Sequence, residues 1–286
     1  MSGGLVDAHV HVWDPRVLDY GWVRTIAALD RPSLPGEIDD ADGAVSRMVF
    51  VQAGAAPTQS LDEARWATES APHWPQLAGI VAAADLRSDA LGAHLDALAA
   101  LPRVVGVRHI LQAEPVERFA DASLRRGLEQ IRERGLTFDA CVVHPQLDAL
   151  ADLLESVPGL PVVLDHLGKP PVDDGIDSPA GRAWTRAIDR IAGRGETSVK
   201  LSGLGAEASA PDRLADNGDA FLAYAFARFG ASRAMIGSDW PVSARLGAAT
   251  TTRGWVGQVA RATGATDAEW REVSAGSAAR FYGLDG

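Results

Sequence analysis

The chain has 286 residues, enough for one large domain, and a formal net charge of −11. This acidic balance argues against a nucleic acid or an acidic membrane surface as a partner, because phosphate binding depends on clustered Lys and Arg, and it leaves a small-molecule substrate as the expected partner. Because Cys141 is its one cysteine, an internal disulfide and a zinc site made of cysteines are excluded. The chain shows no signal sequence and no apolar run of ~18 residues, so we expect the protein in the cytoplasm.

The first predicted strand, residues 6–12, contains two histidines. Apolar and polar residues alternate through it with period two, so in a strand they face opposite sides. His9 and His11 then lie roughly 6–7 Å apart on one face, and imidazoles placed in this way can bind one metal ion or one substrate oxygen. The other interpretation is a pair of structural histidines. The alternation assigns one face to Asp7, His9 and His11, and the other to Val6, Ala8, Val10 and Val12.

The elements that follow alternate between strand and helix. Residues 14–47 are broken by prolines, which predicts a long loop that forms a lid or wall of a pocket. Short apolar runs then predict buried strands, and each is followed by a segment with helical spacing of apolar residues. The predicted strands are 48–52, 77–83, 104–109, 137–143, 161–165, 197–201 and 234–238, and the predicted helices are 60–70, 89–100, 120–134, 147–156, 179–192, 218–229, 252–263 and 267–281.

Eight strand-then-helix units without an intervening linker predict a single domain over residues 1–286. Apolar strands covered by helices indicate a parallel sheet. The number of units and the length of the chain are typical of a (β/α)8 TIM barrel. A doubly wound open sheet is the alternative, although no strand is followed by the Gly-x-Gly-x-x-Gly motif of dinucleotide-binding domains.

Imidazole and charged side chains gather at the carboxyl ends of the predicted strands. Five of the seven histidines stand there, whereas chance would also scatter them over helices and loops. In a barrel these strand ends meet at one mouth, where active sites lie. The residues are His9 and His11 on the first strand, Arg108 and His109 on the fourth, His144 on the fifth, His166 on the sixth and Asp239 on the eighth.

Several of these polar residues also have a structural interpretation. The planar fork of Arg108 suits a substrate carboxylate or hydroxyl groups, but it suits a buried carboxylate such as Asp7 or Asp165 equally well. Lys200 lies within a strand, where an unpaired charge is costly, so an internal salt bridge is expected. Asp239 could serve only as the cap of a turn.

The flanking loops leave both kinds of role open. Trp13, Trp22 and Trp240 are either platforms for a sugar ring or packing residues. Lys169 and Glu207 either contact substrate or belong to a solvated loop. Cys141 is expected to be a small buried apolar residue.

Ordered blocks along nearly the whole chain resemble the amidohydrolase superfamily. They are residues 6–15 (VDAHVHVWDP), 106–109 (GVRH), 144–147 (HPQL), 164–170 (LDHLGKP), 200–204 (KLSGL) and 237–242 (GSDWPV). The blocks are most similar to the amidohydrolase-2 branch of sugar lactonases, the group of L-fuconolactonase, L-rhamnono-lactonase and 2-pyrone-4,6-dicarboxylate lactonase. This resemblance implies a (β/α)8 barrel that hydrolyses a lactone ester in carbohydrate metabolism.

The resemblance also implies a metal site. His9, His11 and Asp239, with His144, match positions of the superfamily's ligands and would hold one divalent ion, zinc or manganese. Catalysis without a metal is the alternative. Members with two metals place a bridging lysine or glutamate at the end of strand four, where this chain has Arg108 and His109, so a two-metal site is not expected.

The implied chemistry is attack of water on a lactone carbonyl. Asp239 would be the base for the water and then the acid for the ring oxygen, with His144 and His166 as further catalytic residues. A metal-dependent decarboxylase or amide hydrolase on the same barrel is the alternative function. The residues expected to bind substrate are Arg108, His109, Trp13, Lys169 and Trp240.

Overall fold

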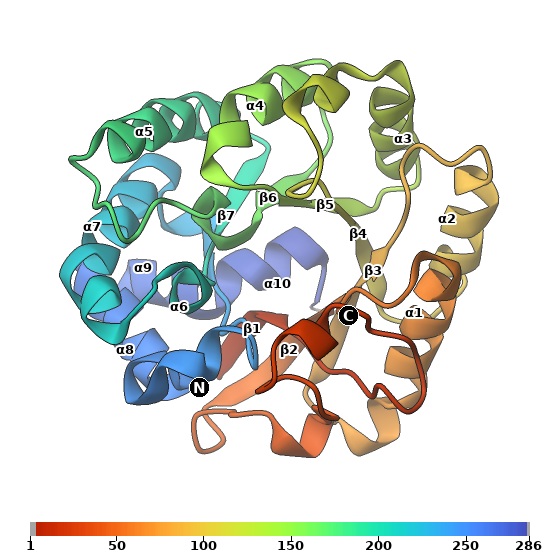
Figure 1. Cartoon of the computed structure of the whole chain (residues 1–286), viewed down its shortest axis with the longest axis horizontal. Helices are drawn as coiled ribbons and strands as arrows, with labels where there is room; N and C mark the ends of the chain where they lie inside the picture. The colour runs from red at the N-terminus through yellow and green to blue at the C-terminus, as the bar shows by residue number, and fades with distance from the viewer. Residues whose placement is uncertain (1–3, 285–286) are drawn as a thin grey trace.

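The computed structural model describes residues 4–284, in which eight parallel strands form one sheet in the order β1 to β8 (Figure 1). The two ends of the sheet meet: Asp239 donates its backbone N–H to the carbonyl of His9 at 2.8 Å, and His11 donates to the carbonyl of Trp240 at 2.8 Å. The barrel is therefore confirmed, and the open-sheet alternative is wrong. The strands are β1 (Leu5–Val10), β2 (Val45–Val51), β3 (Leu77–Ala83), β4 (Val104–Ile110), β5 (Thr137–Cys141), β6 (Val162–Leu164), β7 (Thr197–Leu201) and β8 (Ala234–Ile236).

Helices surround the strands (Figure 1), and buried apolar residues of α1 to α8 pack in one core cluster with the strands. Within residues 4–284, no helix is both long enough and apolar enough to cross a membrane. The helices are α1 (Ser60–Glu69), α2 (Leu91–Ala99), α3 (Ala122–Glu133), α4 (Leu147–Glu155), α5 (Pro179–Ala192), α6 (Leu204–Glu207), α7 (Pro211–Phe229), α8 (Thr252–Thr263), α9 (Asp267–Arg271) and α10 (Ser277–Tyr282).

The last helix, α10, lies across the middle of the ring of strands in Figure 1. Its Ala278 and Tyr282 pack against Val49, Val163 and Met235 in a cluster separate from the main core. The helix predicted over 267–281 runs without a break from Asp267 to Tyr282, with a π-helical turn at Glu272–Gly276 between α9 and α10. Its last part, α10, lies under the barrel, where it fills the end opposite the mouth.

The predicted start of one helix differs from the structure for an identifiable reason. Helix α7 begins at Pro211 rather than at Gly218, because a proline is well tolerated in a first helical turn. Gly218 lies inside this helix. A Cβ added there would be only 3.0 Å from the Gln258 side chain of α8, so the glycine allows a close contact between two helices and does not start one.

Strand β1 does not keep its period-two alternation to its end. Its pairing with β2 shifts register between Asp7 and Val10. Val6 and Ala8 pack with α10, whereas Val10 packs in the main core with the surrounding helices. The prediction that Val6, Ala8, Val10 and Val12 share one face is therefore wrong, and the irregularity lies beside His9.

Candidate active site

A cavity of about 330 Å³ opens at the carboxyl ends of the strands. Five of the predicted site residues, from the ends of four different strands, line it together. Beyond them, Trp22, Cys141 and Glu207 contribute to its wall. The predicted residues in its lining are His11, Arg108, His166, Lys169 and Asp239.

Three histidines converge on one oxygen of Asp239 at this cavity. Asp239 Oδ1 lies 3.4 Å from His11 Nε2 and 3.7 Å from both His9 Nε2 and His166 Nε2. The Nε2 atoms of His9 and His11 are 3.0 Å apart. The convergence of the two β1 histidines predicted from their spacing is therefore confirmed.

Neighbouring groups fix how these side chains point. His11 Nδ1 lies 2.8 Å from the carbonyl oxygen of Val51, which only accepts hydrogen bonds, so the neutral ring carries its proton there and leaves a lone pair on Nε2. His166 Nδ1 lies 2.9 Å from Ser202 Oγ. Ser243 Oγ donates to Asp239 Oδ2 at 2.6 Å, which leaves Oδ1 for the histidines.

Left-handed backbone places two of the converging residues. The turn after β6 has positive φ at four successive residues, including His166 at 53° and Lys169 at 52°, and Asp239 has φ of 55°. Such angles cost side-chain-bearing residues roughly 1–2 kcal/mol each, and they cluster at functional sites. The turn directs His166 back over the barrel mouth, and Gly203 makes room for it, because a Cβ there would lie 2.3 Å from His166 Nδ1.

The protonation states suit metal binding. Burial and the neighbouring Lys200 lower the pKa of His9 well below its ordinary value, and burial lowers the pKa of His166 to about 4. Both rings are therefore neutral near pH 7. Burial alone would raise the pKa of Asp239, but His166 and the other two histidines outweigh burial and lower it overall, so its carboxylate is ionised.

The spacing of these atoms fits a single divalent ion. Tetrahedral zinc with bonds of about 2.0–2.1 Å holds neighbouring ligand atoms about 3.3 Å apart, and the atom pairs above span 3.0–3.7 Å. His9, His166 and Asp239 form the group whose ligand atoms all lie within 4.8 Å of one another. His11 stands outside this group, although its Nε2 lies 3.0 Å from His9 Nε2 and 3.4 Å from Asp239 Oδ1.

A buried network of charges lies beneath the site. Lys200 contacts Asp139 at 2.5 Å and Asp165 at 3.0 Å, which confirms the expected internal salt bridge. Arg108 pairs with Asp165 at 3.3 Å and donates to the carbonyl of Gln52 at 2.5 Å. Yet Arg108 also lines the cavity, and among the described residues its buried Nε has no hydrogen-bond partner.

Four of the predicted site residues lie elsewhere. His144 begins a short turn of helix after β5, outside the cavity lining in the described part of the chain, and His109 binds Glu114 at 2.8 Å beside a second cavity. Trp13 is fully buried, with its ring nitrogen donating to the carbonyl of Arg31, and Trp240 is nearly as buried. The structure thus brings His166, and not His144, to the metal-binding group.

The sequence analysis assigns no role to two supporting serines. Ser202 lies two residues after Lys200, within one of the blocks that carry the resemblance. Ser243 has no signal beyond its place four residues after Asp239. Trp22 was an open candidate and is the tryptophan that lines the cavity.

Comparison with known proteins covers nearly the whole chain. Residues 6–284 match the amidohydrolase family. The chain is 32% identical over 288 residues to an L-fucono-1,5-lactonase of Burkholderia ambifaria, covering 98% of this chain and 96% of that protein. It is 30% identical over 247 residues to an L-fucono-1,5-lactonase of Burkholderia multivorans, covering 83% and 82%.

Solved structures agree with this assignment. The crystal structure of an amidohydrolase from Burkholderia multivorans with bound zinc matches with a TM-score of 0.87 and 28% identity, covering 99% of this chain and 100% of that one. A putative 2-pyrone-4,6-dicarboxylic acid hydrolase from Pseudomonas putida shares the fold, with a TM-score of 0.75 and 23% identity over 99% and 98% of the two chains. The protein therefore belongs to the amidohydrolase family.

Proposed function

We propose that the protein hydrolyses the ester bond of a small lactone, with a sugar-acid lactone as the substrate class. The observation that carries the proposal is the Asp239 carboxylate, which faces three histidines in a cavity also lined by Arg108 and Lys169. The similarity to two L-fucono-1,5-lactonases supports the choice of substrate. A volume of about 330 Å³ accommodates one sugar ring.

Asp239 acts first as a base and then as an acid. Its Oδ1 accepts the proton of the attacking water, and the same proton passes to the ring oxygen as the carbon–oxygen bond breaks. Ser243 holds the other carboxylate oxygen at 2.6 Å, so the residue keeps one orientation through both transfers.

The two cations of the cavity bind and orient the lactone. Arg108 lines the cavity from the end of β4, and Lys169 offers Nζ from the left-handed turn, where Glu207 holds it at 3.2 Å. Such donors, placed where negative charge develops on the carbonyl oxygen, stabilise the transition state. We assign no contact with the lactone to His144, His109, Trp13 or Trp240, because they lie outside this cavity.

A divalent metal fits the donor set of His9, His11, His166 and Asp239. When bound, such an ion lowers the pKa of water and polarises a carbonyl. Arg108 stands where a bridging ligand would be needed, with its Nη1 3.5 Å from His9 Nε2, so we propose one ion and not two.

Hydrolysis of a panel of sugar-acid 1,4- and 1,5-lactones, followed with a pH indicator, tests the proposal. The expected result is turnover of at least one lactone, with no turnover of matched carboxylic acids or amides. Repeating the assay after chelator treatment and after adding zinc or manganese shows whether the metal contributes. Turnover of an acid or amide but of no lactone would replace the proposal by the decarboxylase or amide-hydrolase alternative.

A further inference from the structure

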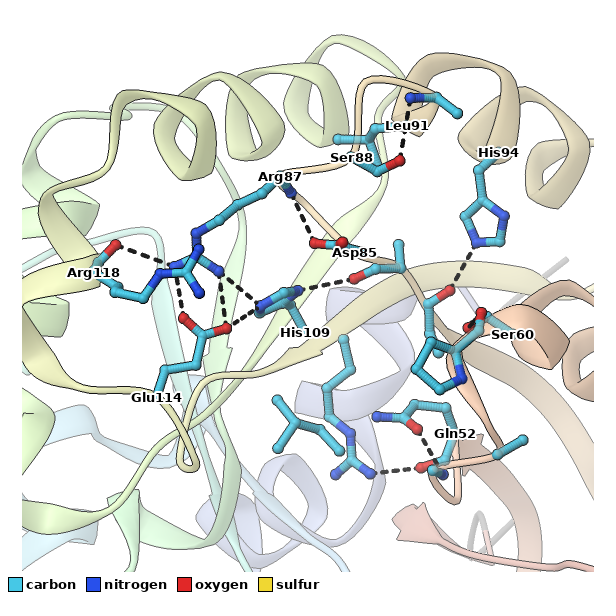
Figure 2. Close-up of a pocket in the computed structure, with 18 residues that line it drawn as sticks. Gln52, Ser60, Asp85, Arg87, Ser88, Leu91, His94, His109, Glu114 and Arg118 are labelled. Carbon is cyan, nitrogen blue, oxygen red and sulfur yellow. Dashed lines mark hydrogen bonds and ion pairs between the residues drawn. The ribbon is translucent and has the colours of Figure 1, made fainter. Parts of the chain in front are cut away.

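A second and larger cavity of about 680 Å³ adjoins the candidate active site. The two share a border formed by Gly54, Arg108 and Ile110, which line both. Figure 2 shows the second cavity between the ends of β2, β3 and β4 and the segments that follow them. A molecule whose reacting ring lies at Asp239 can therefore extend past Arg108 into this space.

Three polar groups of the second cavity are paired with one another. Arg87 contacts Glu114 at 2.7 Å, and His109 contacts Glu114 at 2.8 Å. Figure 2 shows Arg87, His109 and Glu114 pointing toward one another. Asp85, a further carboxylate of the lining, accepts from the backbone N–H of Arg87 at 3.0 Å and would repel an anion. This lining therefore suits hydrogen bonds with an uncharged molecule better than it suits an anion.

The rest of the lining combines hydroxyl groups with small apolar surfaces. Ser60 and Ser88 supply hydroxyls, and Ala84, Ala90 and Leu91 supply apolar contact. Alternation of polar and apolar contacts suits a sugar ring, whose hydroxyls lie around its edge and whose C–H groups lie on its faces. At the border, Arg108 lines both compartments, so its side chain lies beside any molecule that spans them.

We propose that this second cavity binds an uncharged glycosyl substituent, so that the substrates include lactones of disaccharide acids. The inference rests on the proposed lactone hydrolysis and specifies the substrate class further. The lactone ring occupies the smaller cavity and reacts there, while the second sugar makes its contacts beyond Arg108.

Two lactones and two variants test this. Wild-type enzyme is assayed with glucono-1,5-lactone and with lactobiono-1,5-lactone, which carries a galactosyl group on the same ring. Ala90→Trp places a bulky ring on an exposed residue of the second cavity, and Ala93→Trp is its control on an exposed position of α2 outside that lining. The expected result is that Ala90→Trp lowers the kcat/KM ratio of lactobionolactone to gluconolactone by about tenfold, while Ala93→Trp leaves the ratio unchanged.

A binding measurement separates this inference from the lactonase proposal. Calorimetry measures the affinities of the acids lactobionate and gluconate, and it does not depend on turnover. If the wild type binds lactobionate more tightly than gluconate, and Ala90→Trp abolishes this difference, the second compartment is supported even if neither lactone is hydrolysed. Equal binding of the two acids, or a kcat/KM ratio that Ala90→Trp leaves unchanged, overturns the inference while lactone hydrolysis still stands. If the wild type instead prefers 6-phosphogluconolactone to lactobionolactone, and Ala90→Trp abolishes this preference, the inference of an uncharged substituent is overturned in favour of an anionic one.

Discussion

Asp239 connects the cavity, the three histidines and the end of the barrel. Its backbone N–H pairs with the carbonyl of His9, and its side chain faces His9, His11 and His166. The sequence indicated this residue through its place at the end of a predicted strand. Its left-handed backbone and its contact with Ser243 became visible only in the structure.

Replacing Asp239 by Asn tests its role in proton transfer. Asn keeps the shape and can still accept from Ser243, but it cannot take a proton from water, so kcat should fall by about 10²–10⁴-fold. Lactone turnover and circular dichroism of the purified variant measure the effect and confirm folding. Asp212→Asn, a substitution in the first turn of α7, is the control and should leave kcat unchanged. Full activity of Asp239→Asn would show that another group moves the proton.

At the scale of elements, the turns after the strands decide which side chains enter the site. The left-handed turn after β6 carries His166 and Lys169 to the cavity, whereas the turn after β5 leaves His144 outside its described lining. Both histidines follow apolar strands in the sequence, so the strand pattern alone could not separate them.

Gly203, which follows β7, keeps the space for His166 and offers a sharp comparison with Gly230. Both glycines have positive φ, 77° and 72°, but an added Cβ meets His166 only at Gly203 and meets nothing within 4 Å at Gly230. Gly230→Ala should cost roughly 1–3 kcal/mol of stability, because its φ of 72° and ψ of 165° lie in a region that favours glycine, and should leave kcat unchanged. Gly203→Ala should cost more and lower kcat strongly. Urea unfolding and lactone turnover measure both, and equal kcat values would contradict the role of Gly203.

Helix α1 fixes the loop that borders both cavities. The buried carboxylate of Glu63 accepts from the backbone N–H groups of Ala53 and Ala55 at 3.0 and 3.3 Å. Burial raises the pKa of Glu63 from 4.5 to about 7. The folded state therefore holds this proton more tightly than the unfolded state, and this contribution to stability is lost as the pH rises from about 4.5 through about 7.

Glu63→Gln should remove that pH-dependent contribution. Between pH 4.5 and pH 8, the stability of Glu63→Gln relative to the wild type should rise by up to about 3 kcal/mol. Urea unfolding of the variant and the wild type at the two pH values measures this difference in stability. The contributions of the other titrating groups are the same in both proteins and cancel. Glu69→Gln, on an exposed residue of the same helix, is the control. A relative stability that falls with pH would mean that Glu63 is held ionised.

At the scale of the whole molecule, buried charges tie the strands together inside the barrel. Lys200 on β7 links Asp139 on β5 to Asp165 after β6, and Tyr282 of α10 donates to Asp139 at 2.9 Å. This network joins the helix that fills one end of the barrel to the strands that carry the site at the other.

The two lysines of the chain should respond differently to the same substitution. Lys200→Met leaves the buried carboxylate of Asp139 without its cation and leaves Asp165 with Arg108 alone, so it should cost about 3–5 kcal/mol of stability. Lys169→Met, whose partner Glu207 is partly exposed, should cost less than about 1 kcal/mol while it weakens substrate binding. Urea unfolding of both variants measures the contrast. Equal losses of stability would mean that the carboxylates beneath the site carry protons.

The sequence by itself determined the eight strands, most of the helices and the carboxyl-end positions of the polar residues. These features depend on local patterns: apolar runs, helical spacing and breaking residues all act within a few residues. The pairing of Lys200 followed in the same way, because a charge inside a strand of a buried sheet requires a partner.

Only the tertiary structure decided which of these residues meet. It selected His166 over His144, Trp22 over Trp13 and Trp240, and Asp165 over Asp7 as the partner of Arg108. It also shifted the register of β1 and placed α10 beneath the barrel. These outcomes depend on the direction of each turn and on contacts between residues far apart in the chain, which no pattern of neighbouring residues contains.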